Sequence, residues 1–294
     1  MAHTFGWPDV LPRAIHKSLR KIAPLDPWFE IYEISDGVLA IVEPFHFEET
    51  ISFLVQGSEK AVLIDTGMGV GDIRAEAQRL TSLPIAVINT HWHYDHIGGN
   101  YQFRDVWAYD NDFEVGKMER GMTVAEASPQ MSPNRVCRPL PAGFDPSNYE
   151  IRRCAVTRRL RHLEQVDLGQ RSLIIHHTPG HSPGGICLFD TEDRILFTGD
   201  TYYPGTMYAN LQRSDFRTFL SSIKYLAGLV KDVSFLATSH NESKVASSEI
   251  RDALKGFEQI NAGTAPYTVA RGTRMYKFDR FLLECPDTES PDRR

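Results

Sequence analysis

The sequence predicts an α/β fold, in which short buried strands alternate with helices that cover them. Two observations lead to this prediction. Runs of β-branched and aliphatic residues, typical of buried strands, recur between residues 38 and 238. Between these runs, apolar residues recur at the three- and four-residue spacing of helices that bury one face. The chain has 294 residues, enough to bury a full core, and we expect one domain over residues 1–294.

The first half of the chain has the most regular strand pattern. Closely spaced β-branched runs, broken by turn residues, predict strands at 38–42, 51–56 and 61–65. Residues 72–80 then follow helical spacing, which places Ile73, Ala77 and Leu80 on one face. The remaining elements expected in this half are a strand at 85–89, a strand at 106–109 and a helix at 111–120.

The second half repeats the alternation after a long proline-rich stretch. Residues 121–149 contain five prolines and little periodicity, which predicts an irregular insertion and a possible lid. Ser214 or Asp215 can cap a helix that runs to Leu229. The other expected elements are strands at 173–177, 186–190, 195–198 and 233–238, a helix at 247–260 and a strand-like segment at 275–283.

Both ends of the chain are expected to lie outside the core. Residues 1–28 are mixed and interrupted by prolines, which predicts an N-terminal extension packed on the outside of the domain. Residues 286–294 are polar and predict a frayed tail.

Composition narrows the class of protein. A net charge of −6 disfavours a nucleic-acid partner, because such proteins usually carry a basic surplus. The N-terminus has no apolar core of the kind a signal peptide needs, and no stretch is apolar enough for a membrane span. The four cysteines are widely spaced, which favours reduced thiols. We therefore expect a cytoplasmic protein that acts on a small molecule, as a monomer or homodimer.

A cluster of metal-binding residue types follows the strand expected at 85–89. The segment Thr-His-Trp-His-Tyr-Asp-His at 90–96 contains His91, His93, Asp95 and His96. Imidazole and carboxylate groups are common ligands of zinc and of related ions. Because this pattern is too dense for isolated surface or core histidines, it indicates one metal site and the start of a second.

Three further candidate ligands each stand just after a predicted strand. They are His181, Asp200 and His240. In α/β folds, strand ends at one edge of a sheet converge on the ligand-binding cleft. The sequence therefore predicts that these side chains meet the cluster at 91–96.

Four sequence motifs then suggest a family. The HxHxDH motif, the TPGHSPG run, the FTGD turn and the final strand-end histidine, from about Val38 to His240, resemble the motif series of the metallo-β-lactamase-fold hydrolase superfamily. The resemblance implies a four-layer αββα sandwich with the site at one end of the paired sheets. LIDTGMG at 63–69 is similar to the first motif of the family, which implies that Asp65 orients ligands without binding metal.

The resemblance also implies a role for each candidate ligand. His91, His93 and His181 would bind one metal, Asp95, His96 and His240 a second, and Asp200 would bridge the two. Two Zn²⁺ ions per chain are the default expectation, with iron or manganese possible. A hydroxide held between the ions would be the nucleophile. The residues expected to take part in catalysis are Asp95, Asp200 and Tyr203.

Local likeness to N-acyl homoserine lactonases favours one branch of this family. These enzymes have a substrate-binding tyrosine three residues after the bridging aspartate, as Tyr203 follows Asp200, although they have Phe in place of Tyr94. The main expectation is therefore hydrolysis of a carboxylic ester, above all a lactone. Tyr203 can instead be a packing residue whose hydroxyl bonds the backbone.

Three alternatives to the lactonase stay open. A thioester hydrolase of glyoxalase II type shares all seven ligand positions and the turn at Gly199–Thr201, although its helical glutathione-binding part is not recognisable here. A persulfide dioxygenase would use a single iron held by two histidines and an aspartate. A metal-stabilised interaction module without catalysis is the third alternative.

Overall fold

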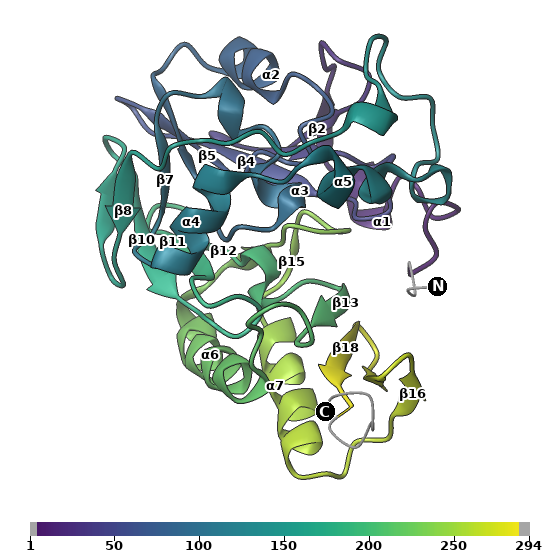
Figure 1. Cartoon of the computed structure of the whole chain (residues 1–294). Coiled ribbons are helices and arrows are strands. Elements are labelled where there is room, and N and C mark those ends of the chain that lie inside the picture. Colours follow the sequence, from purple (N-terminus) through teal and green to yellow (C-terminus); the bar gives the residue numbers. More distant parts are fainter. Residues whose placement is uncertain (1–4, 288–294) are drawn as a thin grey trace.

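Two β-sheets lie face to face in the computed structural model, which describes residues 5–287 (Figure 1). Helices cover the outer face of each sheet, so the layers run helix, sheet, sheet, helix. The four-layer αββα sandwich expected from the sequence is confirmed. Among the described residues, no helix is both long enough and apolar enough to cross a membrane.

The first sheet has eight strands in chain order. They are β1 (Arg20–Ile22), β2 (Glu30–Ser35), β3 (Val38–Val42), β4 (Ile51–Gln56), β5 (Ala61–Ile64), β6 (Ile85–Ile88), β7 (Val106–Tyr109) and β8 (Arg158–Leu160). Neighbours are antiparallel from β1 to β5 and parallel from β5 to β8. Parallel pairing places the ends of β5 and β6 at the same edge, where the histidine cluster begins.

The N-terminal segment is part of this layer and not only an extension. It contains helix α1 (Ala14–Ser18) and the edge strand β1, which pairs with β2. Neither β1 nor β2 was predicted, because both mix charged and apolar residues. Trp7 is buried and donates its indole N–H to the Pro44 carbonyl at 3.0 Å.

The second sheet has six strands, in the order β15-β14-β12-β11-β10-β9. They are β9 (Gln165–Asp167), β10 (Ser172–His177), β11 (Ile186–Asp190), β12 (Ile195–Phe197), β14 (Phe235–Ala237) and β15 (Val245–Ala246). The core between the two sheets is aliphatic and aromatic, and Phe53 meets Phe197 edge-on across it at 5.2 Å. Each fully buried side chain of this size stabilises the fold by about 1.5–3 kcal/mol.

The longer helices begin after capping residues. Asp72, Asn111 and Asp215 accept backbone N–H bonds at the starts of α2 (Ile73–Leu80), α4 (Asp112–Arg120) and α6 (Phe216–Leu229). Helices α2 and α4 cover the first sheet, while α6 and α7 (Glu249–Asn261) cover the second.

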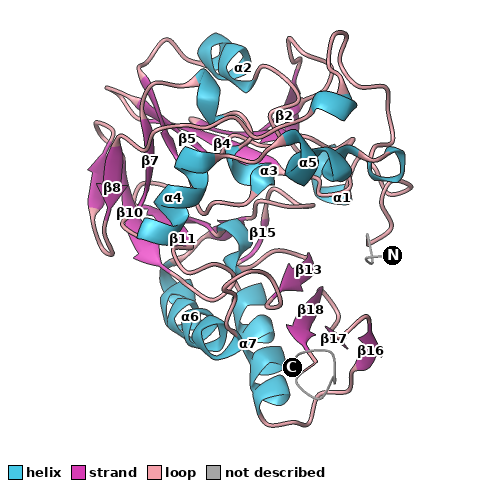
Figure 2. Ribbon diagram, in the orientation of Figure 1, coloured by secondary structure: helices cyan, strands magenta, loops and turns pink. Residues whose placement is uncertain are grey.

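A third, four-stranded sheet packs beside α7 (Figure 2). It consists of β13 (Gly205–Tyr208), β16 (Thr268–Ala270), β17 (Thr273–Lys277) and β18 (Phe281–Pro286). The single strand-like segment expected at 275–283 is instead a hairpin, closed by the bond from Phe278 N–H to the Phe281 carbonyl. Pro286, the first residue of the tail predicted at 286–294, instead belongs to β18, and residues 288–294 lie outside the described part of the chain.

The insertion at 121–149 is more regular than predicted. It contains helix α5 (Val124–Ala127) and three short 3-10 helices. Ala127 and Met131 are buried, and a β-bridge joins Val136 to His46. The insertion is therefore packed onto the first half of the domain, and two of its side chains line the cavity described below.

Candidate metal centre

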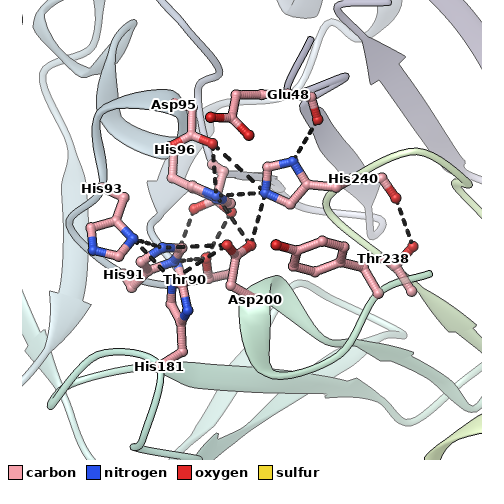
Figure 3. A network of polar contacts seen from close by, with 12 residues as sticks. Glu48, Thr90, His91, His93, Asp95, His96, His181, Asp200, Thr238 and His240 are labelled. Carbon is pink, nitrogen blue, oxygen red and sulfur yellow. Dashed lines mark hydrogen bonds and ion pairs between the residues drawn. The ribbon is translucent and has the colours of Figure 1, made fainter. Parts of the chain in front are cut away.

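The turns that follow several strands bring all seven candidate ligands together (Figure 3). His91 and His93 lie on the turn after β6, and Asp95 and His96 lie on the short helix α3 (Tyr94–Ile97). The other three ligands come from turns of the second sheet: His181 after β10, Asp200 after β12 and His240 after β14. The convergence expected at the strand ends is what the structure shows.

The first donor group consists of three histidines and one oxygen of Asp200. His93 Nδ1 lies 2.9 Å from His91 Nε2 and 2.9 Å from His181 Nε2. Asp200 Oδ2 lies 3.4 Å from His181 Nε2 and 3.9 Å from His91 Nε2. Four donor atoms thus surround one point.

The second donor group uses the other oxygen of Asp200. Asp200 Oδ1 lies 3.2 Å from His96 Nε2 and 3.0 Å from His240 Nε2. Asp95 Oδ2 lies 3.6 Å from His96 Nε2 and 3.7 Å from His240 Nε2. Figure 3 shows the Asp200 carboxylate between the two groups, which is the position of a bridging ligand.

Hydrogen bonds on the outer ring nitrogens turn the inner nitrogens toward these two points. His181 Nδ1 lies 3.0 Å from the Tyr208 carbonyl, and His240 Nδ1 lies 2.7 Å from the Glu48 carbonyl. Because a carbonyl only accepts, each Nδ1 carries a proton, so Nε2 is the atom that can offer a lone pair to a metal at the centre. Lone pairs at such short separations repel each other unless a cation lies between them.

The separations fit metal ions of ordinary size. With a metal–nitrogen distance of about 2.0 Å, the edges of a tetrahedral site are roughly 3.3 Å. The distances above scatter around that length in both groups. In addition, Asp200 Oδ1 is buried and faces the Nε2 atoms of His96 and His240, which are themselves candidate ligands. The donor set therefore fits a pair of divalent ions.

The electrostatics of the two groups differ. Burial lowers the pKa of His91 and His93 well below the ordinary value, so both are neutral, as metal ligands must be. Burial acts on His96 and His240 too, but the nearby carboxylates outweigh it, with Asp200 first. They raise the pKa of His96 well above its ordinary value and that of His240 to about 9. Metal binding at the second group must therefore displace protons.

Asp65 forms hydrogen bonds to Thr90 and His96, in the segment that carries four candidate ligands, which is the orienting position that the resemblance implied. Its Oδ1 accepts the Thr90 backbone N–H at 2.7 Å. Its Oδ2 accepts the Thr90 hydroxyl and the His96 Nδ1–H, both at 2.8 Å. A fully buried carboxylate thereby fixes the ring of one ligand and the turn that carries the others.

A cavity of about 330 Å³ opens beside the donor groups. Four candidate ligands line it, together with Tyr203: His93, Asp95, His181 and Asp200. The other lining residues are Phe47, Glu48, Trp92, Tyr94, Gln130, Arg135, Tyr208, Leu211 and Gln212. Its volume is at the lower end of the range for small-molecule sites. Five of the fourteen lining residues form an aromatic wall, which suits an uncharged, largely apolar group: Phe47, Trp92, Tyr94, Tyr203 and Tyr208.

Tyr203 lines this cavity, but its hydroxyl is already engaged. The phenol donates to the Thr206 carbonyl, and its ring lies 4.6 Å from the ring of His240. The burial of Tyr203 raises the pKa of this phenol well above its ordinary value. The backbone-bonded arrangement is thus the one present, and a role in proton donation stays a prediction.

Several cavity residues were not singled out from the sequence. Glu48 accepts the Tyr94 hydroxyl at 2.6 Å, and its burial raises the pKa of its carboxyl to about 7. Arg135 belongs to the insertion, and Tyr208 lies on β13. No strand-end pattern marks these positions, because they reach the cavity from turns and from a strand that tertiary packing places there.

Comparison with known proteins agrees with this geometry. The family model of the metallo-beta-lactamase superfamily matches residues 49–240, a span that includes all seven candidate ligands. The acyl-coenzyme A thioesterase MBLAC2 of Bos taurus is 31% identical over 69% of this chain and 77% of its own length. The hydroxyacylglutathione hydrolase GloC of Haemophilus influenzae is 23% identical over 72% of this chain and 95% of its own.

Solved structures give the same fold. The B3 metallo-beta-lactamase BLEG-1 superposes with a TM-score of 0.52 at 21% identity, over 71% of this chain and 96% of that one. On the family match, the strand-end ligands and the αββα layers together, the chain belongs to the metallo-beta-lactamase superfamily and is a metal-dependent hydrolase.

Proposed function

We propose that this protein hydrolyses a thioester, with two divalent ions, zinc by default, held in the two donor groups. One observation carries the proposal: two complete donor groups share the Asp200 carboxylate and open onto a cavity lined by aromatic rings. The relatives named for thioester hydrolysis support the choice of substrate class. They favour the glyoxalase II-like alternative over the lactonase that was the main expectation from the sequence.

The chemistry of the leaving group also supports a thioester over a lactone. A thiol has a pKa near 8.5, so a thiolate can leave without first taking up a proton. The alkoxide from a lactone is far more basic and benefits from a general acid. The phenol of Tyr203 donates to the Thr206 carbonyl and is not free for that task. This arrangement suits a leaving group that needs no proton.

Each part of the site has a separate task in this proposal. When bound, the two ions would supply the Lewis acidity that brings the pKa of water toward neutrality and polarises the thioester carbonyl. Asp200 spans both donor groups and fixes their separation. Asp65 and the carbonyls of Glu48 and Tyr208 hold the imidazole rings in place. The aromatic wall receives the acyl part and excludes water from it.

Metal analysis and a substrate panel test the proposal. Purified protein should contain about two equivalents of zinc-type metal and release thiol from an acyl-coenzyme A and from S-lactoylglutathione faster than it opens an acyl homoserine lactone. Asp200→Asn should lose metal and activity together, while Asp252→Asn, an exposed aspartate paired with Lys255, should keep both. One equivalent of iron with persulfide oxidation would refute the hydrolase, and preferential lactone opening would refute the thioester.

A further inference from the structure

We propose that Arg135 and Lys117 form a cationic rim that binds the phosphate groups of a nucleotide-bearing thiol, so that the substrate is an acyl thioester of the coenzyme A type. The inference rests on the proposed thioester hydrolysis and adds to it the recognition of the leaving half. At about 330 Å³ the cavity can hold an acyl group and the reacting carbonyl, but not a nucleotide as well. The larger half of such a substrate must therefore project past the rim.

Arg135 belongs to the insertion at 121–149 and lines the cavity. Its guanidinium lies 4.5 Å from the centre of the Phe47 ring, and it donates to Gln130, with all three residues lining the cavity. A short 3-10 helix, Pro133–Arg135, and the bond from Phe47 N–H to the Arg135 carbonyl at 2.9 Å hold its backbone. The cation is thus placed by the fold, while its side chain remains partly exposed.

Lys117 approaches the same cavity from helix α4. Its ammonium group lies 4.6 Å from the centre of the Trp92 ring and donates to Gln212 Oε1 at 2.7 Å. Trp92 and Gln212 both line the cavity, and Gln212 is exposed, so this contact marks the mouth. Rim cations therefore come from two separate segments of the chain.

In the described part of the chain, neither of these cations is held by a carboxylate, in contrast to arginines that belong to surface ion pairs. Arg159, for example, is paired with Asp110 and Asp112 at 3.0 and 2.6 Å. Within residues 5–287, Arg135 and Lys117 contact aromatic rings and amide oxygens and have no ion pair within 4.0 Å. Two such cations beside one cavity favour an anionic ligand at its mouth.

The anion belongs to the thiol half and not to the acyl half. Glu48, Asp95 and Asp200 all line the cavity, and Glu48 is not among the metal donors. An acyl chain that carried a carboxylate would have to lie against the acidic side chain of Glu48 and the aromatic rings of the cavity, which disfavours its binding. Arginine and lysine at the rim are the residues that bind phosphate oxygens, through a planar fork and a point charge respectively.

Three substrates with the same acyl group and different thiols separate the possibilities. They are the coenzyme A thioester, the glutathione thioester and the neutral N-acetylcysteamine thioester. In Arg135→Gln, we expect KM for the coenzyme A thioester to rise about tenfold, with kcat within twofold and the neutral thioester unaffected. Added NaCl should raise this KM in the unmodified protein and less so in the variant, because salt screens exposed charges.

Arg138→Gln is the matched control. Arg138 also belongs to the insertion and lies over an aromatic ring, Phe45 at 4.0 Å, but it does not line the cavity. It should leave every constant unchanged. Binding of free coenzyme A, followed by calorimetry, should weaken in Arg135→Gln and in Lys117→Gln but not in Arg138→Gln.

The outcomes distinguish this inference from the proposed function. Equal KM changes for charged and neutral thioesters, or no change at all, would overturn the rim and leave thioester hydrolysis standing. A loss confined to the glutathione thioester would overturn the assignment to phosphate. If none of the thioesters is hydrolysed, the proposed function fails, and unweakened coenzyme A binding in Arg135→Gln would independently overturn the rim.

Discussion

Replacing Arg13 should destabilise the protein far more than replacing an ordinary surface arginine. Arg13 makes two hydrogen bonds to Glu49 and a third, at 2.9 Å, to Asn241 Oδ1. The Glu49 side chain is only 1% exposed. Arg13→Ala would leave this carboxylate buried without its cation, a change that typically costs about 3–5 kcal/mol in the free energy of unfolding.

Arg13→Ala should also lower the affinity of the protein for metal. Asn241 follows the ligand His240, and it joins Arg13 to the Pro204 carbonyl through its two amide atoms. The backbone beside it is constrained as well, since Asn241 N–H bonds the Glu49 carbonyl and Glu49 and Asn241 both have positive φ. We therefore expect Arg13→Ala to weaken metal binding at the second donor group, which contains His240, more than at the first donor group.

Urea denaturation of the metal-free protein, with chelator competition for the metal, measures both effects. Arg20→Ala is the control and should change the free energy of unfolding little, because Arg20 pairs with Glu33 at the surface with 65% of its side chain exposed. The double variant Arg13→Met, Glu49→Leu should recover most of the loss, since no buried charge remains. Equal losses for Arg13→Ala and Arg20→Ala would refute the reasoning.

Asp65→Asn should lower metal affinity about 10–100-fold in a chelator titration, because the outer hydrogen bond that orients a ligand histidine is weakened. Gly67→Ala should lower the melting temperature, since φ is +64° and the new Cβ would lie 1.8 Å from a buried carboxylate oxygen, whereas Gly116→Ala meets nothing within 4 Å and should be tolerated. Burial lowers the pKa of His16 to about 4, so between pH 6.5 and 4 the unfolded chain binds a proton that the folded chain does not. As the pH is lowered through that range, the free energy of unfolding should decrease by up to roughly 3 kcal/mol, and above pH 6.5 this group should have no effect. In His16→Phe the decrease, measured by urea denaturation at each pH, should be smaller. Tyr203→Phe should keep kcat for a thioester within about threefold, and a hundredfold loss would restore its role as a proton donor.

The strands that the sequence predicted best are those buried on both faces. Strands β3, β4, β7 and β11 have the predicted bounds, and every residue of β3 is buried. Such strands form continuous apolar runs that need no tertiary information to recognise. The short edge strands β8 and β9 contain Arg-Arg-Leu and Gln-Val-Asp, and nothing in those residues distinguishes them from loops. Their strand conformation comes from pairing with a neighbour that is already in place.

The ligands were predictable for a related reason, and the cavity was not. Each ligand follows a strand, so local pattern and sheet geometry together determine where it lies. The cavity walls come from segments such as 47–48, 130–135 and 208–212, whose meeting depends on how an insertion and a third sheet pack. The meeting of the candidate ligands could therefore be predicted from motifs, whereas the choice between lactone and thioester could not.

The metal donor groups and the side chains around the cavity affect the choice of substrate differently, for a physical reason. Two dications, if held by only the two carboxylates Asp95 and Asp200, would leave the centre with a net positive charge able to stabilise an oxyanion on any carbonyl substrate. This interaction is common to esters, lactones and thioesters, so it cannot select among them. Selection requires contacts that only one substrate class can make. Beyond the donor groups, the side chains able to make such contacts are the aromatic wall and the cations Arg135 and Lys117, which come from the parts of the chain that the ligand motifs do not cover.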